Sequence, residues 1–230
     1  ELKIAKVIPL HKGDSRTVYS NYRPVSVLTC FSKIFEILIY NRFIAFIEKY
    51  SLLNDNQFGF RKDHSTVMAL LALIDKISKA LEEGDYVIGI FLDFSKAFDT
   101  VNHSILFKKL EHYGIRGIAL SLIQDYLTNR YQFVNINGVC SEKDMITCGV
   151  PQGSVLGPLL FLLYINDIVN ISNVLYTILF ADDTNALLRG KNLDQMSVIL
   201  NEELEKILLW LNANKLSLNI KKNSLYDFSI

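Results

Sequence analysis

The sequence has few cysteines and no long apolar run, and both absences exclude classes of protein. Its three cysteines, Cys30, Cys140 and Cys148, are an odd number at spacings that fit no zinc-ligand pattern, so we expect reduced thiols in an intracellular compartment. The longest strongly apolar run, residues 155–165, contains a glycine and a proline and is well short of the roughly 20 residues that a membrane span needs. We therefore expect no transmembrane helix.

The sequence also has no excess of charge, with 24 residues of each sign and a formal net charge of zero. A domain that binds a polyanion commonly carries a basic patch, so the balance gives no sign of such a partner. With half of its 230 residues apolar, the chain can build one substantial core or two small subdomains. Residues 1–12 lack the features of a secretory signal and do not begin with Met, so we expect a piece of a longer protein.

The first third of the chain is predicted to be mainly helical. Residues 4–10 form a short strand, and residues 21–24 an irregular link before a long helix that starts at residue 26. We expect this helix to bury a stripe of apolar positions at helical spacing, Leu28, Phe31, Ile34, Phe35, Leu38 and Ile39. A second helix begins at the cap Ser65 and ends near Gly84, and its inward side chains are predicted to be Met68, Leu71, Ile74 and Leu81.

The rest of the chain mixes strands and helices. Residues 86–92 are a continuous apolar, β-prone run that ends at Asp93, which is typical of a strand buried on both faces of a sheet. Residues 176–180 and 184–188 are β-prone runs around an A-D-D junction at 181–183, which predicts a hairpin with carboxylates at its tip. The other expected elements are helices at 104–113, 118–129, 154–168 and 193–211, and a hairpin of 132–136 with 143–147 around Asn137-Gly138.

Together these elements predict an α+β fold. The order strand, helix, hairpin, helix favours an antiparallel sheet backed by helices, as in the split βαβ arrangement of ferredoxin-like (RRM) cores. The helices before residue 86 are expected to form a second lobe.

Two acidic positions stand out because each follows a hydrophobic strand: Asp93, and the pair Asp182-Asp183 about 90 residues later. Carboxylates beside buried apolar strands need a balancing charge. Mg²⁺ supplies one, since it prefers oxygen ligands from one or two carboxylates, with substrate phosphates completing the shell. The alternative is that these aspartates only cap turns, which is the commoner role of an isolated Asp-Asp pair.

Several sequence blocks surround these acids in a fixed order. They are N-Y-R-P-V-S at residues 21–26, N-Q-F-G-F-R at 56–61, F-L-D-F-S-K-A-F-D-T-V-N-H at 91–103, G-V-P-Q-G-S-V-L-G-P at 149–158 and F-A-D-D at 180–183. In this order they resemble the reverse transcriptases of non-LTR (LINE-type) retrotransposons, in particular the jockey-like lineage, over essentially the whole chain. The resemblance implies an RNA-directed DNA polymerase, a nucleotidyltransferase that joins a nucleotide from a dNTP to a primer 3′-hydroxyl.

The resemblance also implies a right-hand polymerase fold, with fingers at residues 1–85 and a palm at 86–223. A fingers-like excursion is expected at about 114–150, and residues 224–230 are expected to be a truncated C-terminal edge, with the thumb absent. A thumb and an endonuclease are implied as covalent neighbours outside this fragment. A basic segment in one of these neighbours can supply phosphate contacts, of which the balanced charge of this chain gives no sign.

For the chemistry, the resemblance makes Asp93 and Asp182 the metal-bridging ligands and Asp183 the neighbouring acid of the same hairpin. All three are predicted to be catalytic and to hold two Mg²⁺ ions, with Mn²⁺ as an alternative ion. Each carboxylate would help to neutralise the charge that develops as the primer 3′-hydroxyl attacks the α-phosphate of the nucleotide.

Phe98 lies five positions after Asp93, where the family places a bulky aromatic against the 2′ position of the sugar. A rigid ring there excludes ribose, so the product is expected to be DNA; the alternative is an ordinary core phenylalanine. The other residues implied to bind the nucleotide are Arg61, Lys62, Phe94, Gln152, Gly153 and Lys222. Those implied to contact nucleic acid are Arg23 and Pro151.

Several of these residues have simpler alternatives. Arg61 suits bidentate phosphate contact better than Lys62, for which a solvated loop charge is the alternative. Arg23 is equally suited to a structural ion pair. Lys222 lies in the block L-N-I-K-K-N at 218–223, in which Asn223 replaces the threonine usual in the family, and a surface lysine is its alternative.

The implied partners are an RNA template, a DNA primer and dNTPs, without a membrane, and the implied location is nuclear. Three rival hypotheses remain. A viral RNA-dependent RNA polymerase shares the acids but must accept ribose, which Phe98 argues against. A group II intron or retron reverse transcriptase shares the chemistry, and a decayed, domesticated remnant would bind nucleic acid without activity.

Overall fold

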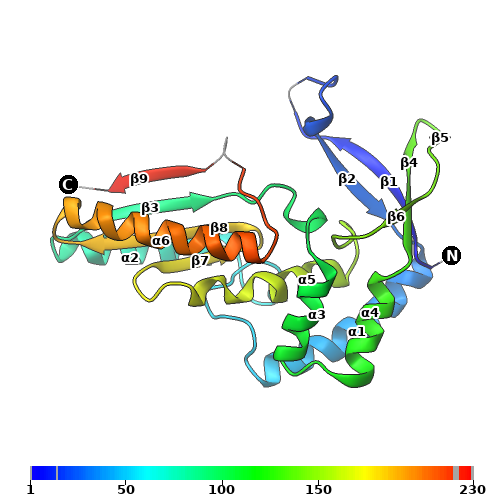
Figure 1. Cartoon of the computed structure of the whole chain (residues 1–230), viewed down its shortest axis with the longest axis horizontal. Helices are drawn as coiled ribbons and strands as arrows, with labels where there is room; N and C mark the ends of the chain where they lie inside the picture. The colour runs from blue at the N-terminus through cyan, green and yellow to red at the C-terminus, as the bar shows by residue number, and fades with distance from the viewer. Residues whose placement is uncertain (1, 14, 220–222, 229–230) are drawn as a thin grey trace. The chain divides into compact units, whose positions relative to one another are not determined.

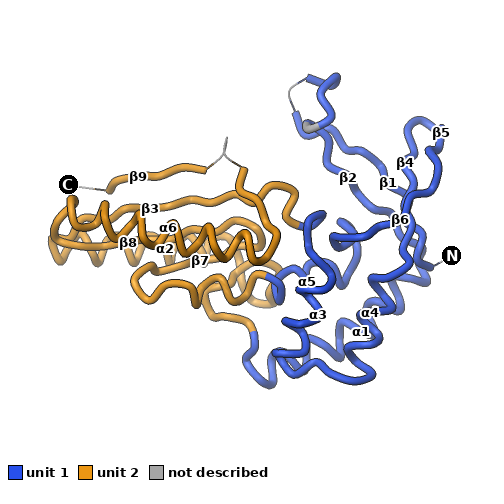
Figure 2. Tube along the Cα trace, in the orientation of Figure 1, with its two compact units in different colours: residues 1–52, 98–164 blue, residues 53–97, 165–230 orange. Residues whose placement is uncertain are grey.

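The computed structural model describes residues 2–13, 15–219 and 223–228, which fold into two compact units (Figures 1 and 2). Unit 1 comprises residues 1–52 and 98–164, and unit 2 comprises residues 53–97 and 165–230. Both units combine helices with a sheet, so the predicted α+β class is confirmed. None of the helices among the described residues has the length and apolarity of a membrane span.

Unit 1 contains a sheet in the order β2-β1-β4-β5, with β6 also paired to β4. β1 runs antiparallel to β2 and parallel to β4. The strands are β1 (Ile4–His11), β2 (Tyr22–Val27), β4 (Arg130–Ile136), β5 (Val139–Cys140) and β6 (Asp144–Ile146). The helices are α1 (Cys30–Lys49), α3 (His103–His112), α4 (Gly117–Leu127) and α5 (Leu156–Ile165), with short 3₁₀ turns η1 (Tyr19–Asn21) and η2 (Ala97–Asp99). The last residue of α5 and the first of η2 are counted with unit 2.

Two predictions for this unit are wrong. Residues 22–24, expected to be part of an irregular link, belong to strand β2; Pro24 is tolerated because β2 is an edge strand. The apolar stripe predicted for this helix is mostly exposed, with Phe31 at 69 % and Leu38 at 59 % exposure. Of its members, Leu28, which precedes α1, is buried as predicted, and Ile39 is half-buried. Apolar spacing identifies the helix, but α1 is apolar on several sides, and the face that is covered carries Ser32, Glu36, Phe43 and Ile47.

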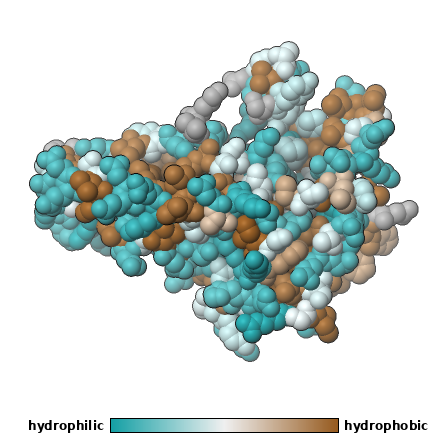
Figure 3. Space-filling view, viewed as in Figure 1, coloured by the Kyte–Doolittle hydropathy of each residue, from teal (hydrophilic) through white to brown (hydrophobic). Residues whose placement is uncertain are grey.

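Apolar side chains also gather at the tip of the β4–β5 hairpin (Figure 3). Val139 is 75 % exposed there, and Ile136 is exposed as well. The turn itself is Asn137-Gly138, and both residues have positive φ, as a two-residue hairpin of this composition requires. The hairpin was expected from that dipeptide and is confirmed.

The buried carboxylate of Glu36 lies on the covered face of α1 because it caps helix α5. Its side chain is 1 % exposed, and its Oε2 accepts hydrogen bonds from the backbone N of Val155 (2.5 Å) and of Leu156 (3.4 Å). A carboxylate at a helix N-terminus satisfies free N–H groups and interacts favourably with the helix dipole. Burial raises the pKa of Tyr126 and the nearby Glu36 raises it further, so this phenol stays protonated.

We expect Glu36→Ala to lower the free energy of unfolding by about 3 kcal/mol, because it leaves buried N–H groups of α5 without an acceptor. Glu36→Gln keeps an acceptor and should lose roughly half as much. Urea denaturation followed by circular dichroism measures both, with Glu48→Ala on an exposed position of α1 as the matched control. A loss for Glu36→Ala no larger than that of the control contradicts the capping role.

Unit 2 contains an antiparallel sheet in the order β7-β8-β3-β9. Its strands are β3 (Tyr86–Leu92), β7 (Tyr176–Phe180), β8 (Asp183–Gly190) and β9 (Ser224–Phe228). Its helices are α2 (Thr66–Glu82) and α6 (Leu193–Ala213), with a 3₁₀ segment η3 (Asn166–Asn170); α2 contacts β3 and β7, and α6 contacts β8. Because Val87 and Ile88 are adjacent on β3 and both buried, both faces of this strand are covered, as predicted.

The inward face predicted for α2 is wrong. Met68, Leu71 and Ile74 are exposed, and the buried positions are Ala69 and Ala80. Of the four predicted side chains, Leu81 does pack against the core and is half-buried. Small alanines let the helix lie close to the sheet, where Ala80 packs with Val87 and Leu187. Strand β9 was not expected, since its side chains are largely exposed and its position depends on pairing with β3.

Candidate active site

The hairpin of β7 and β8 carries two of the predicted acids at its tip. Phe180 pairs with Asp183, so Ala181 and Asp182 form a two-residue turn, which confirms the predicted hairpin. Ala181 has a φ of +55°, a conformation that residues other than glycine adopt uncommonly and at some energetic cost. The turn is therefore strained at the residue that precedes Asp182.

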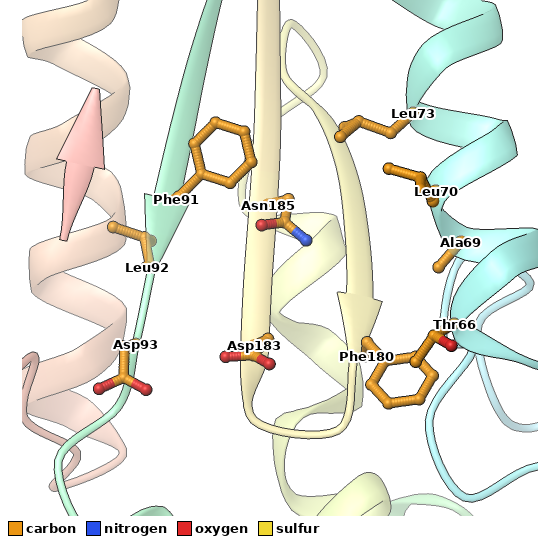
Figure 4. A pocket seen from close by; sticks show the side chains of 10 residues that line it. All are labelled: Thr66, Ala69, Leu70, Leu73, Phe91, Leu92, Asp93, Phe180, Asp183 and Asn185. Atoms are coloured by element: carbon orange, nitrogen blue, oxygen red, sulfur yellow. The ribbon is translucent and has the colours of Figure 1, made fainter. Parts of the chain in front are cut away.

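Asp93 and Asp183 lie next to each other at one end of the unit 2 sheet (Figure 4). The antiparallel register pairs Leu92 with Thr184, and its continuation places Asp93 opposite Asp183. Both aspartates line a pocket of about 380 Å³, together with residues of α2 and the sheet: Thr66, Ala69, Leu70, Leu73, Phe91, Leu92, Phe180 and Asn185. Asp93 is half-buried and Asp183 is exposed, and Asp182 in the turn is half-buried.

Two asparagines near the C-terminus hold Asp93, and neither was predicted to contact it. Asn219 donates from Nδ2 to Asp93 Oδ2 and from its backbone N to Asp93 O, both at 2.8 Å. Asn223 Oδ1 accepts a hydrogen bond from Asp93 N at 3.0 Å. The block at 218–223 pointed to this segment, but to Lys222, which lies outside the described residues.

The loop at residues 54–61 contains Arg61, which the resemblance assigned to the nucleotide. Its Nη1 donates to Asn54 O at 2.8 Å and to Gln57 O at 3.1 Å, so this part of the guanidinium fixes the loop. Lys62 is exposed. Phe94 is 3 % exposed and forms an isolated β-bridge with Leu218.

A second set of predicted residues meets in unit 1. Phe98 is half-buried, and its ring stacks on that of Phe161 with centroids 4.5 Å apart and planes at 26°. Val150 N donates to Phe98 O at 2.8 Å. The side chain of Gln152 donates to Asp99 Oδ1 at 2.9 Å, which ties the G-V-P-Q-G segment to the turn that carries Phe98.

The same segment also touches strand β2. Ser26 N donates to Gln152 O at 2.7 Å, and Gly153 approaches so closely that a Cβ would lie 2.6 Å from Ser26 O. Gly153 has a φ of +114°, so the position requires glycine on both counts. Pro151 is buried, and Arg23 is exposed on β2. The predicted residues therefore form two sets, one in each unit.

The acids of unit 2 fit a magnesium site by the type of their donors. Among the described residues, no three His, Cys, Asp or Glu side chains converge into a closed metal cluster. Mg²⁺ does not need one, because it is commonly held by one or two carboxylates together with substrate phosphates. Asp93 and Asp183 on an open pocket offer that donor set.

Comparison with known proteins decides the family. A family model described as reverse transcriptase (RNA-dependent DNA polymerase) matches residues 10–227, which is almost the whole chain. The chain belongs to the reverse transcriptase family.

Relatives of this reverse transcriptase chain include proteins of mobile elements. It is 34 % identical over 194 residues to the probable RNA-directed DNA polymerase from transposon X-element, and 33 % identical over 229 residues to the RNA-directed DNA polymerase from mobile element jockey, both of Drosophila melanogaster. These matches cover 82 % and 96 % of this chain, but 21 % and 25 % of the relatives. The chain thus spans about a quarter or less of their length, and the predicted resemblance to non-LTR retrotransposon reverse transcriptases is confirmed.

Solved structures agree on the fold. An apo telomerase from Candida tropicalis superposes with a TM-score of 0.70 at 10 % identity, over 98 % of this chain and 45 % of the telomerase chain. A C-terminally truncated form of the same enzyme gives a TM-score of 0.68 at 12 % identity, over 100 % of this chain and 51 % of that one. The predicted right-hand polymerase class of this reverse transcriptase chain is confirmed, while the residue boundaries of fingers and palm stay a prediction.

Proposed function

We propose that the chain is the catalytic core of an RNA-directed DNA polymerase encoded by a non-LTR retrotransposon. The observation that carries the proposal is the meeting of Asp93 and Asp183 on one open pocket beside the Ala181-Asp182 turn, in a chain of the reverse transcriptase family. Acids gathered at paired strand ends beside a pocket are suited to phosphoryl transfer, in which the protein positions reactants and offsets charge.

Asp93, Asp182 and Asp183 would hold two Mg²⁺ ions, or Mn²⁺ in their place. Ions bound there would stabilise the attacking and leaving oxygens of the transfer. The chain itself contributes ordered ligands: Asn219 fixes both the side chain and the backbone of Asp93. A ligand that is already ordered loses less conformational entropy when it binds.

The residues of unit 1 would select and orient the nucleotide. Phe98 would block a 2′-hydroxyl, and its stacking on Phe161 supports a ring held in one orientation. Gln152 and Gly153 would lie along the nucleotide, and the exposed backbone of Gly153 permits close approach. The resemblance adds contacts of Arg61, Lys62, Phe94 and Lys222 with the nucleotide and of Arg23 and Pro151 with nucleic acid.

The proposed partners are an RNA template, a DNA primer and dNTPs, and the proposed place of action is the nucleus. In a protein as long as the relatives, the segments outside this chain would include a thumb and an endonuclease. Such segments would also supply basic side chains for the phosphate backbone, since this chain has a net charge of zero.

Primer extension tests the proposal. The longest natural protein that contains this chain is incubated with a DNA primer on an RNA template, dNTPs and Mg²⁺. We expect labelled product that is destroyed by DNase, survives RNase, and is absent when EDTA removes the metal. A folded protein that binds the primer–template but never extends it contradicts the proposal and supports the decayed binding remnant.

A further inference from the structure

The loop at residues 54–61 lies along the strand that leads to the acidic turn, inside unit 2. Phe58 N donates to Leu179 O at 2.8 Å, and Leu179 N donates to Asn56 O at 2.9 Å. These bonds form a parallel bridge between Gln57 and Leu179, two residues before the turn. The loop is thus joined to β7 by one isolated bridge.

The side chain of Gln57 reaches the turn itself. It is 1 % exposed, and its Oε1 accepts hydrogen bonds from Ala181 N at 3.0 Å and from Gly59 N at 2.8 Å. Ala181 is the residue with positive φ, directly before Asp182. A buried amide oxygen therefore holds the backbone of the strained residue in place, where an unpaired N–H would be costly.

Gly59 lies against the backbone at the start of the same turn. A Cβ on Gly59 would lie 2.1 Å from Ala181 N, 2.8 Å from Ala181 Cα and 2.9 Å from Phe180 C. The obstacle is backbone, which cannot swing away as a flexible side chain would. The absence of a side chain at Gly59 is thus what allows the loop to touch the turn.

We propose that Gln57 and Gly59 are positioning residues that fix the Ala181-Asp182 turn and so set where the carboxylates of Asp182 and Asp183 lie. This inference rests on the proposed function. Gln57 and Gly59 would affect the reaction by holding the turn, without contacting the substrate. Displacing a catalytic group by about 1 Å costs about 100-fold in rate, and losing an outer contact of a metal ligand costs about 10- to 100-fold.

Gln57→Met is the sharpest variant, because methionine has nearly the same volume but no hydrogen-bond acceptor of comparable strength. In primer extension by the longest natural protein that contains the chain, we expect kcat to fall about 10- to 100-fold. The KM for dNTP and the affinity for primer–template should stay within about twofold of wild type. The matched control is Gln195→Met, at an exposed position of α6, which should extend like wild type.

Two further readouts report on the turn directly. Hydrogen exchange at the Ala181 amide should become about tenfold faster in Gln57→Met, since one buried hydrogen bond is lost. Glycine relieves the strain of a positive φ, so Gln57→Met should cost less kcat in an Ala181→Gly background than alone. Gly59→Ala should also lower kcat, because the added methyl group would displace the backbone of the turn.

The outcomes separate this inference from the proposed function. A wild-type protein without extension overturns the function and the inference with it. A wild-type protein that extends while Gln57→Met keeps kcat within about twofold overturns the inference alone. Equal losses in kcat and primer–template affinity, with full additivity to Ala181→Gly, also overturn it, because they indicate a general loss of folding instead of a displaced turn.

Discussion

Asp93→Asn is expected to reduce the rate of nucleotide addition by about 1,000-fold or more and to leave the protein folded. The substitution keeps the size of the side chain and its ability to accept from Asn219, but it removes a charge that would offset developing negative charge in the transition state. Without metal, Asp93 and Asp183 are like charges on neighbouring strand ends. Removing one of them should leave the melting temperature unchanged or raise it.

Asp194→Asn is the matched control for this prediction, since Asp194 is exposed in the first turn of α6. Single-nucleotide extension in rapid quench measures the chemistry, and thermal unfolding measures the fold. Near-normal extension by Asp93→Asn contradicts its assignment as a metal ligand. A large drop in melting temperature would instead make Asp93 a structural residue.

Phe98→Val is expected to raise the use of ribonucleotides relative to deoxyribonucleotides by roughly 10- to 100-fold, which is the range a hydrophobic pocket can discriminate for one hydroxyl. The smaller side chain leaves room for a 2′-hydroxyl and no longer stacks on Phe161. The ratio of kcat/KM for an rNTP to that for the matching dNTP measures the effect. Overall stability should fall by about 1 to 3 kcal/mol, because a half-buried ring is lost.

Phe107→Val, at a half-buried position of α3, is the control for this change, since it removes a ring from the same unit. It should leave the sugar preference as in wild type. An unchanged rNTP-to-dNTP ratio in Phe98→Val would refute the steric role and return Phe98 to an ordinary packing residue. Greater ribonucleotide use in both variants would point to a general loosening of unit 1.

The elements that could be predicted from the sequence are those defined by local pattern. A few neighbouring residues determine the apolar strand β3 and the β7–β8 hairpin around the A-D-D junction, and both predictions are confirmed. Helix faces are different, because an apolar side chain is buried only if another element covers it. Phe31 and Met68 show this: each lies at helical spacing with other apolar residues, yet both are exposed.

The residues of the site also differ in whether local sequence could identify them. The acids could be proposed from the order of short motifs around Asp93 and Asp182. The residues that hold them could not, because Gln57 meets Ala181, and Asn219 meets Asp93, across more than a hundred positions of sequence. Asn223 was seen only as a departure from the family pattern, whereas its side chain binds the backbone of Asp93. Contacts of this kind appear only once the chain is folded.

If the protein is an RNA-directed DNA polymerase whose metal site includes Asp182, one paired comparison will show it. Wild-type protein and Asp182→Asn are compared in Mg²⁺-dependent extension of a DNA primer on an RNA template, with primer–template binding measured for both. We expect extension by wild type, equal binding by both proteins, and no extension by Asp182→Asn. Extension by the variant at the wild-type rate, or binding without extension by the wild type, would contradict it.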